Sequence, residues 1–284
     1  MYRKVICSAV FLAGVLTGCQ PGSEAPENAD QASTTQDSTT MAHDPHSYSQ
    51  PQEAVVKHLH WKAQVLFDSN YIQATATWDI EAREGADSII LDTYGLKIQE
   101  VKVDGKPAEY ELGDFQEEMG RPLRVRLDGE VGQVSIRYRT TDQARALQWQ
   151  DPEQTAAGKA PFLFTQSQAI LARSWVPCQD SPGVRFSYDA EVEVPEGMLA
   201  LMSAENPQED SPQGRYTFKM PQPIPSYLLA LAVGELEFES ISPRAGVYAE
   251  APLLDTAAYE FADLEKMIVA AEELYGPYAW ERYD

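Results

Sequence analysis

Residues 184–194 read Val-Arg-Phe-Ser-Tyr-Asp-Ala-Glu-Val-Glu-Val, with an apolar side chain at every second position. Because neighbouring side chains of a β-strand point to opposite faces, this alternation predicts a strand with one buried face. Further strands are predicted at residues 71–82, 88–91, 96–103, 122–127 and 134–138, and the β region extends through 198–202, 215–220 and 226–233. Many half-buried strands are typical of antiparallel sheets, so we predict a mainly β fold, either a sandwich or a curled sheet.

Turn and proline signals indicate how these strands connect. Asp104-Gly105, between two alternating segments, is typical of a tight β-hairpin. Residues 221–225 read Pro-Gln-Pro-Ile-Pro, and because proline has no backbone N–H to donate, we expect a connection there. The next segment, 226–233, is nearly all apolar, which favours a strand covered on both faces.

The strand pattern is interrupted by residues 162–182, which read Phe-Leu-Phe-Thr-Gln-Ser-Gln-Ala-Ile-Leu-Ala-Arg-Ser-Trp-Val-Pro-Cys-Gln-Asp-Ser-Pro. Polar side chains on such a connection are placed to contact a ligand. The alternative is a long crossover between sheets, fixed by a structural ion pair between Arg173 and Asp180. Cys178 has no histidine after residue 60 to activate it, so we expect a buried packing thiol rather than a nucleophile.

A single helix is predicted near the end of the sequence. Asp255 or Thr256 can cap its start, and Gly276-Pro277 can end it. One face should be apolar and need a partner, because apolar residues recur there at helical spacing: Phe261, Leu264, Ile268, Ala271 and Tyr275.

Residues 1–18 have the features of an export signal. Arg3 and Lys4 precede an apolar run at 5–16 that is too short for an ordinary membrane-spanning helix. The run ends in Leu-Thr-Gly-Cys at 16–19, which resembles the lipobox of bacterial lipoprotein signal peptides. The resemblance implies cleavage before Cys19, a lipid anchor on its sulfur, and an exported protein in the bacterial cell envelope, facing the periplasm or in the outer membrane. An ordinary signal peptide with a chance cysteine is the alternative.

Residues 19–53 are rich in small and polar side chains and are predicted to form a disordered tether. His43 and His46 lie in this segment, and His58 and His60 follow just beyond it. Such spacing raises the hypothesis of a structural metal site. We nevertheless expect no metal on this chain, because the first pair lies in the tether and the second alternates along a strand.

The formal charge of −22 comes from 44 acidic and 22 basic residues. Nucleic-acid binding depends on lysine and arginine neutralising phosphates, so with this composition we expect no nucleic-acid partner. It also argues against polybasic attachment to anionic lipid. If the lipobox assignment is correct, the acyl chains on Cys19 are the expected membrane contact.

A further set of segments carries a family resemblance that extends from about residue 55 to 284. The segments are Ala-Leu-Gln-Trp at 146–149, Leu-Phe-Thr-Gln-Ser-Gln-Ala-Ile at 163–170, Pro-Cys-Gln-Asp-Ser-Pro at 177–182, Pro-Ile-Pro-Ser-Tyr-Leu at 223–228 and Trp-Glu-Arg-Tyr-Asp at 280–284. They resemble the N-terminal part of zinc aminopeptidases in the leukotriene hydrolase/aminopeptidase branch. The resemblance implies a saddle-like antiparallel β domain over 54–250, followed at 251–284 by the first helix of a truncated thermolysin-like α/β catalytic domain.

In that family the next domain carries a G-x-M-E-N loop and an H-E-x-x-H helix that binds zinc, and neither motif occurs in this sequence. Two histidines one turn apart and a carboxylate would hold zinc while leaving a position for water. We therefore expect zinc as the cofactor of the full-length protein, none bound by this chain, no catalytic residue in it, and no activity of the chain alone.

The resemblance also implies that Gln166, Ser167 and Gln168 line the mouth of the active site, with Gln168 helping to position the N-terminal residue of a peptide substrate. A side-chain amide can accept from an ammonium group and donate to a carbonyl. For Gln166, hydrogen bonding within the turn is the alternative. The chain is thus expected to be part of an exported, lipid-anchored zinc aminopeptidase that removes N-terminal residues from peptides. The other hypothesis is a stand-alone, non-catalytic β lipoprotein that binds peptides or a protein partner.

Overall fold

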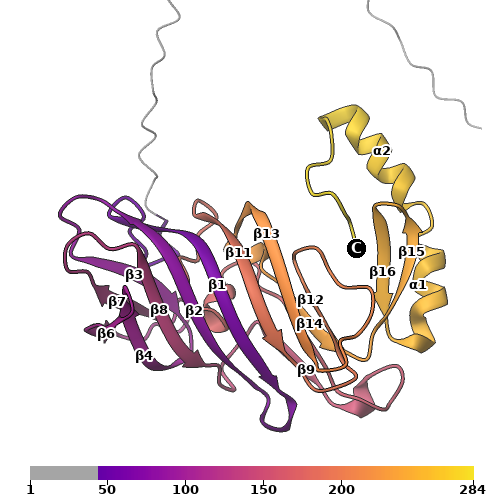
Figure 1. Cartoon of the computed structure of the whole chain (residues 1–284), viewed down its shortest axis with the longest axis horizontal. Coiled ribbons are helices and arrows are strands. Elements are labelled where there is room, and N and C mark those ends of the chain that lie inside the picture. Colours follow the sequence, from indigo (N-terminus) through magenta and orange to yellow (C-terminus); the bar gives the residue numbers. More distant parts are fainter. Residues whose placement is uncertain (1–43) are drawn as a thin grey trace, which may run out of the picture. The chain divides into compact units, whose positions relative to one another are not determined.

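The fold was analysed in a computed structural model, which describes residues 44–284. Cys19, the export signal and His43 lie outside the described residues. The strands of the largest sheet are β1 (Ala54–Leu66), β2 (Tyr71–Ala82), β4 (Lys97–Val103), β5 (Lys106–Pro107), β8 (Gln133–Arg139), β11 (Arg185–Glu193) and β13 (Arg215–Pro225). Their order across the sheet is β13-β11-β1-β2-β8-β4-β5. Figure 1 labels all of these strands except β5.

Three smaller sheets complete the β part of the described chain. One contains β12 (Leu199–Met202), β14 (Leu231–Gly234), β10 (Phe162–Thr165) and β9 (Leu147–Gln150), in that spatial order. A second contains β3 (Ser88–Thr93), β7 (Arg121–Arg126) and β6 (Tyr110–Leu112), and the third is the hairpin of β15 (Glu237–Ser242) and β16 (Ala245–Ala249). The prediction of a mainly β, antiparallel architecture is confirmed, with one exception: β1 and β11 pair in parallel.

The helices are short and come mostly at the end. They are the 3₁₀ turns η1 (Phe67–Ser69), η2 (Pro152–Gln154), η3 (Ala172–Ser174), η4 (Ser226–Leu228) and η5 (Ala251–Leu253), and the α-helices α1 (Leu254–Glu260) and α2 (Leu264–Tyr275). Within residues 44–284, none of these helices is long and apolar enough to cross a bilayer.

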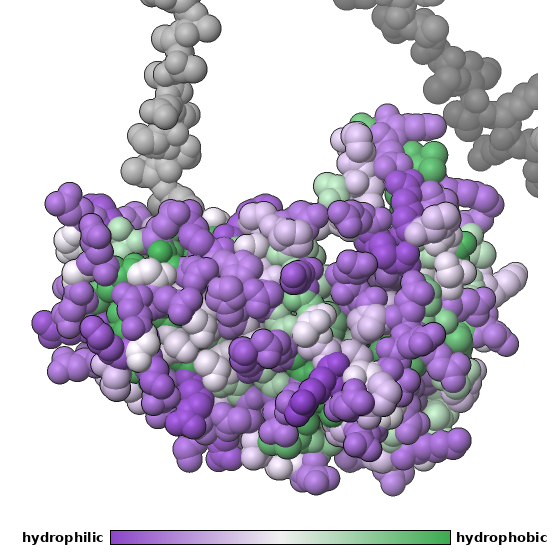
Figure 2. Space-filling view, viewed as in Figure 1, coloured by the Kyte–Doolittle hydropathy of each residue, from purple (hydrophilic) through white to green (hydrophobic). Residues whose placement is uncertain are grey.

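The period-2 segments form the core as predicted. In β2 the buried face consists of Ile72, Ala74, Ala76, Trp78 and Ile80. In β11 the alternate positions Phe186, Tyr188, Ala190 and Val192 are buried in the same way. Trp78 meets Phe186 edge to face at 4.8 Å between ring centroids, a geometry that stabilises beyond the area it buries. The opposite side chains are polar, and Figure 2 shows a mainly hydrophilic surface on the side in view.

The proline run at 221–225 is not the connection we expected, because it forms the last part of β13. Pro225 is opposite Arg185, and Ile224 is opposite Phe186. β13 lies at the edge of the sheet, with β11 as its neighbour there. An edge strand leaves one row of its backbone groups without a neighbouring strand. Because proline lacks an N–H, placing it in this row removes no hydrogen bond of the sheet.

The strand expected over 226–233 is also shorter than predicted. Residues 226–228 form η4, in which the Leu229 N–H donates to the Ser226 carbonyl at 3.0 Å. The strand β14 begins at Leu231. Apolar composition alone did not distinguish a covered strand from a buried turn, since both exclude water from their side chains.

The single helix predicted over 255–276 is two helices, separated by a turn at 261–263. Ile268 is the one buried residue of α2, whereas Phe261 and Tyr275 are 51% and 87% exposed. The apolar face that we expected to need a partner therefore remains largely uncovered by residues 44–284.

The fold begins earlier than the tether boundary at residue 53 suggested. Ser47 and Ser49 are buried, at 3% and 4% exposure. The Tyr48 backbone N–H donates to Asp92 Oδ1 at 2.7 Å, and the Ser47 hydroxyl donates to the other carboxylate oxygen. Asp92 is fully buried and needs such donors, which explains why this polar segment packs against the sheet. The last residues of the expected tether are thus part of the domain.

Candidate functional site

The predicted substrate-binding residues lie on a turn that follows β10. The Gln166 N–H donates to the Ala146 carbonyl at 2.9 Å, and the Leu171 N–H donates to the Ser167 carbonyl at 2.8 Å. These two bonds hold both ends of the turn. Gln166 and Gln168 are exposed, Ser167 between them is buried, and the Gln168–Ala169 peptide bond is cis.

Ser167 has a different role from the one we expected for its side chain. It is 3% exposed, and its hydroxyl donates to the Leu229 carbonyl at 2.9 Å while accepting from the Trp175 indole at 3.0 Å. With its donor used and one acceptor position filled inside the protein, the hydroxyl does not face the solvent. Ser167 therefore fixes the turn from within, and substrate contact stays a prediction for the two glutamines.

A buried aromatic network supports this anchor. The Trp175 ring meets the Trp61 ring edge to face at 5.3 Å between centroids. The Trp61 indole donates to the Tyr138 hydroxyl at 3.0 Å, which donates to the Trp175 carbonyl at 2.8 Å. All three side chains are at most 1% exposed. The turn is consequently tied to β1 and β8 of the large sheet through residues that have little freedom to move.

The two exposed glutamines differ in what their amides already bind. Gln166 Oε1 accepts from the Gln168 backbone N–H at 3.1 Å, so the alternative of hydrogen bonding within the turn holds for that oxygen. The side-chain amide of Gln168 makes no hydrogen bond to residues 44–284, although its backbone is fixed. Within the described part of the chain, Gln168 thus offers an unpaired donor and an unpaired acceptor on a turn that is held by backbone hydrogen bonds.

Arg173 and Asp180 form the structural ion pair that we predicted. Arg173 Nε donates to Asp180 Oδ2 at 3.0 Å, and both side chains are at most 1% exposed. The same guanidinium donates to the carbonyls of Met119 at 3.0 Å and His46 at 2.8 Å. Arg173 thereby joins the crossover to two remote segments, and because each of its three guanidinium nitrogens has an acceptor the buried charge is tolerated.

Cys178 is buried, as expected of a packing thiol. Burial raises the pKa of the thiol well above its usual value, and the nearby carboxylates of Asp180 and Asp92 raise it further. Because the thiolate is the reactive form, this environment makes Cys178 a poor nucleophile.

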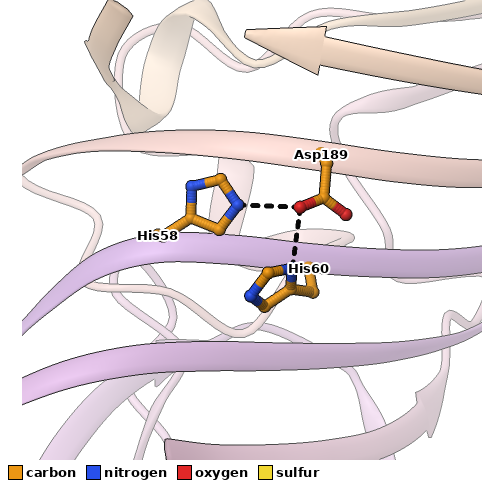
Figure 3. Close-up of side chains that lie close together, drawn as sticks. All are labelled: His58, His60 and Asp189. Carbon is orange, nitrogen blue, oxygen red and sulfur yellow. Dashed lines mark hydrogen bonds and ion pairs between the residues drawn. The ribbon is translucent and has the colours of Figure 1, made fainter. Parts of the chain in front are cut away.

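A second polar cluster joins three side chains that the sequence left apart. His58 and His60 from β1 converge on Asp189 from β11, as Figure 3 shows, and their ligand atoms lie within 4.8 Å of one another. This group of possible metal ligands shares no residue with the turn at 166–171. The alternation in 184–194 identified Asp189 as surface-facing, but the parallel pairing of β1 with β11 gave no signal in the sequence.

Residues 45–228 match the family model described as the Peptidase M1 N-terminal domain. A leukotriene A-4 hydrolase from Xenopus laevis is 42% identical over 252 residues, which are 85% of this chain and 41% of that protein. A leucine aminopeptidase 2 from Yarrowia lipolytica is 39% identical over 217 residues, 75% of this chain and 33% of its own length.

Solved structures give the same result for the fold. The structure of yeast LTA4 hydrolase in complex with bestatin has a TM-score of 0.81 at 33% identity, covering 87% of this chain and 39% of that one. The M1 zinc metallopeptidase from Deinococcus radiodurans has a TM-score of 0.66 at 21% identity, which shows a shared fold alone. The chain spans well under half the length of the curated relatives it matches.

Proposed function

This chain belongs to the M1 peptidase family, whose N-terminal domain it carries, and on that premise we propose that it forms one wall of the substrate site in a zinc aminopeptidase. The observation that carries the proposal is Gln168, an exposed residue whose side-chain amide bonds to no residue of 44–284, on a turn that is held by buried hydrogen bonds. Its carbonyl oxygen is suited to accept from the ammonium group of a peptide's N-terminal residue. Gln166 supplies the support by accepting from the Gln168 backbone.

We do not propose that residues of this chain bind the catalytic zinc. The H-E-x-x-H motif does not occur in the sequence, and the one cluster of possible metal ligands among residues 44–284 is a different set of side chains. When bound in the full-length protein, zinc would supply an activated water for peptide hydrolysis. This chain contributes orientation of the substrate, which lowers the barrier by holding the reacting groups in place.

We propose further that the protein is exported and held at the bacterial cell envelope through a lipid on Cys19. The support is the sequence of residues 1–19, in which a basic start and an apolar run lead to Leu-Thr-Gly-Cys.

The enzyme assignment is tested with the coding sequence beyond Asp284. An open frame that contains H-E-x-x-H, and a longer protein that releases N-terminal residues from peptides only when zinc is present, would support it. A longer protein that folds and binds zinc but releases no amino acid would refute it, and a peptide-binding protein without hydrolysis would favour the non-catalytic alternative.

A further inference from the structure

We propose that His58, His60 and Asp189 form a site for a divalent transition-metal ion, with Zn²⁺ as the expected occupant. The site lies on the polar face of the seven-stranded sheet and joins β1 to β11 (Figure 3). It is separate from the proposed substrate wall and does not depend on the aminopeptidase function.

The pairing of β1 with β11 brings the three side chains together. Residues two apart on a strand share a face, so His58 and His60 project to the same side of β1. The parallel register places Asp189 opposite His60 and Ser187 opposite His58. As a result, His58 Nε2 lies 2.8 Å and His60 Nδ1 lies 2.7 Å from the same oxygen, Asp189 Oδ2.

The donor set matches the chemistry of zinc. Two imidazole nitrogens and one carboxylate oxygen are frequent zinc ligands, and three protein ligands leave a position for water. A tetrahedral ion with bonds of about 2.0–2.1 Å keeps its ligand atoms about 3.3 Å apart. The two histidine–aspartate pairs therefore need to open by roughly half an ångström. The side chains of His58, His60 and Asp189 are 27%, 38% and 41% exposed, which leaves room for this adjustment and a path for the ion.

Outer hydrogen bonds orient both rings, as they do in most histidine–metal sites. His58 Nδ1 lies 2.7 Å from the Ser187 hydroxyl, and His60 Nε2 lies 3.3 Å from Asp79 Oδ2. Asp79 is held in turn by Gln133, whose amide donates to its other oxygen at 2.9 Å. Each ring thus has one nitrogen directed at the proposed ion and the other occupied by a neighbour from an adjacent strand.

The contacts of His60 can be satisfied in two ways. His60 places both ring nitrogens against carboxylates, whereas a neutral imidazole has a single N–H. An imidazolium, with two N–H donors, would satisfy both carboxylates as an ion pair. A metal between His60 Nδ1, His58 Nε2 and Asp189 Oδ2 would satisfy the Asp189 side and leave the His60 N–H to Asp79, so saturable metal binding separates the two arrangements.

An ion held here would connect two segments about 130 residues apart and stabilise the one parallel pair of the sheet.

The test uses the 284-residue chain, which lacks the zinc helix of the family. Zn²⁺ is titrated by calorimetry and Co²⁺ by visible absorption, with circular dichroism to verify that each variant is folded. We expect one ion per chain, a Co²⁺ spectrum typical of nitrogen and oxygen ligands, and a higher melting temperature with Zn²⁺. His58→Gln, His60→Gln and Asp189→Asn should each weaken binding at least about tenfold.

Two control variants test whether binding is specific to His58, His60 and Asp189. Lys62 and Glu191 pair in the next equivalent register position with a 2.8 Å contact, so Lys62→Gln with Glu191→Gln should leave the affinity unchanged. A His43→Gln, His46→Gln double variant tests the histidines nearer the N-terminus. The proposal is overturned if no saturable 1:1 binding occurs, if His60→Gln and Asp189→Asn bind as tightly as the parent, or if binding is lost only in the His43/His46 variant.

Discussion

The Trp175 indole donates a hydrogen bond to the buried Ser167 hydroxyl at 3.0 Å, one residue before the exposed Gln168. Through this contact, buried side chains fix the backbone next to an exposed amide. The Ser167 hydroxyl also donates to the Leu229 carbonyl, and the Trp175 ring packs edge to face against Trp61. A substrate-positioning group gains from such support, because a loosely held group loses much of its effect on orientation.

Ser167→Ala should destabilise the domain by about 1–3 kcal/mol, because it leaves the Trp175 N–H and the Leu229 carbonyl without a buried partner. Urea unfolding measured by tryptophan fluorescence gives the difference. Ser240→Ala is the matched control, since that exposed hydroxyl bonds only within its own hairpin turn, and should change stability by less than about 0.5 kcal/mol. Equal effects at the two serines would contradict the anchoring role.

Arg173→Met should cost about 3–5 kcal/mol, because it leaves the Asp180 carboxylate buried without its cation. The surface pair Arg215–Glu193, at 3.1 Å, provides the comparison, and Arg215→Met should cost no more than about 1 kcal/mol. Both values come from equilibrium denaturation. A small effect of Arg173→Met would mean that the crossover does not depend on this ion pair.

The attachment of α2 should depend on pH through Glu272. Arg244 Nη2 and Nη1 contact the two Glu272 oxygens at 2.7 and 2.8 Å, and this pairing, with the Tyr278 N–H, lowers the pKa of Glu272 to about 2. Since the folded-state pKa lies below the ordinary value, the stabilisation is present above about pH 4.5 and is lost as pH falls through 2.

Comparison of the parent with Glu272→Gln checks the sign of this dependence. The difference in unfolding free energy should be constant above pH 4.5 and shrink as the pH approaches 2. A carbon-13 titration of the Glu272 carboxyl gives the pKa directly, and a midpoint near 4.5 would rule out the proposed pairing in solution.

Cys19→Ser should release the protein from membranes if the lipobox assignment is correct. Expression in a bacterial host with labelled fatty acid should give a labelled, membrane-associated parent and an unlabelled variant. Cys178→Ser serves as the control, because that thiol is buried and should carry no lipid. Labelling that persists in Cys19→Ser would exclude this cysteine as the anchor.

Strands were predicted well from the sequence where buried and exposed residues alternate. They were predicted poorly where the position of a strand in the sheet determines which residues it can contain. Segments 71–82 and 184–194 show the same faces in sequence and structure, because their apolar residues bury one side of a sheet. The strand through 221–225 was missed because nothing local reveals that β13 is an edge. The break at 261–263 was missed because apolar spacing continues across it while the backbone turns.

For the candidate sites too, some features could be predicted from the sequence and others only from the fold. Gln166, Ser167 and Gln168 were predicted as substrate-binding residues from a family resemblance, but only the fold revealed that the serine points inward. The Arg173–Asp180 pair lies within seven residues and was predictable. The cluster of His58, His60 and Asp189 was not, since its members are joined by a parallel strand pair across about 130 residues.

We proposed that Gln168 orients the substrate's N-terminal residue, and the most direct test is steady-state hydrolysis of an N-terminal aminoacyl substrate by a zinc-loaded protein that contains this chain together with an H-E-x-x-H motif. Gln168→Ala should lower kcat/KM about 10- to 100-fold, the effect of losing a hydrogen bond to a charged group, with unchanged folding and zinc content. Gln148→Ala, an exposed glutamine on β9 whose amide bonds to the nearby Arg145 carbonyl, should leave kcat/KM unchanged. Equal activity of the Gln168→Ala variant and the parent would contradict the account.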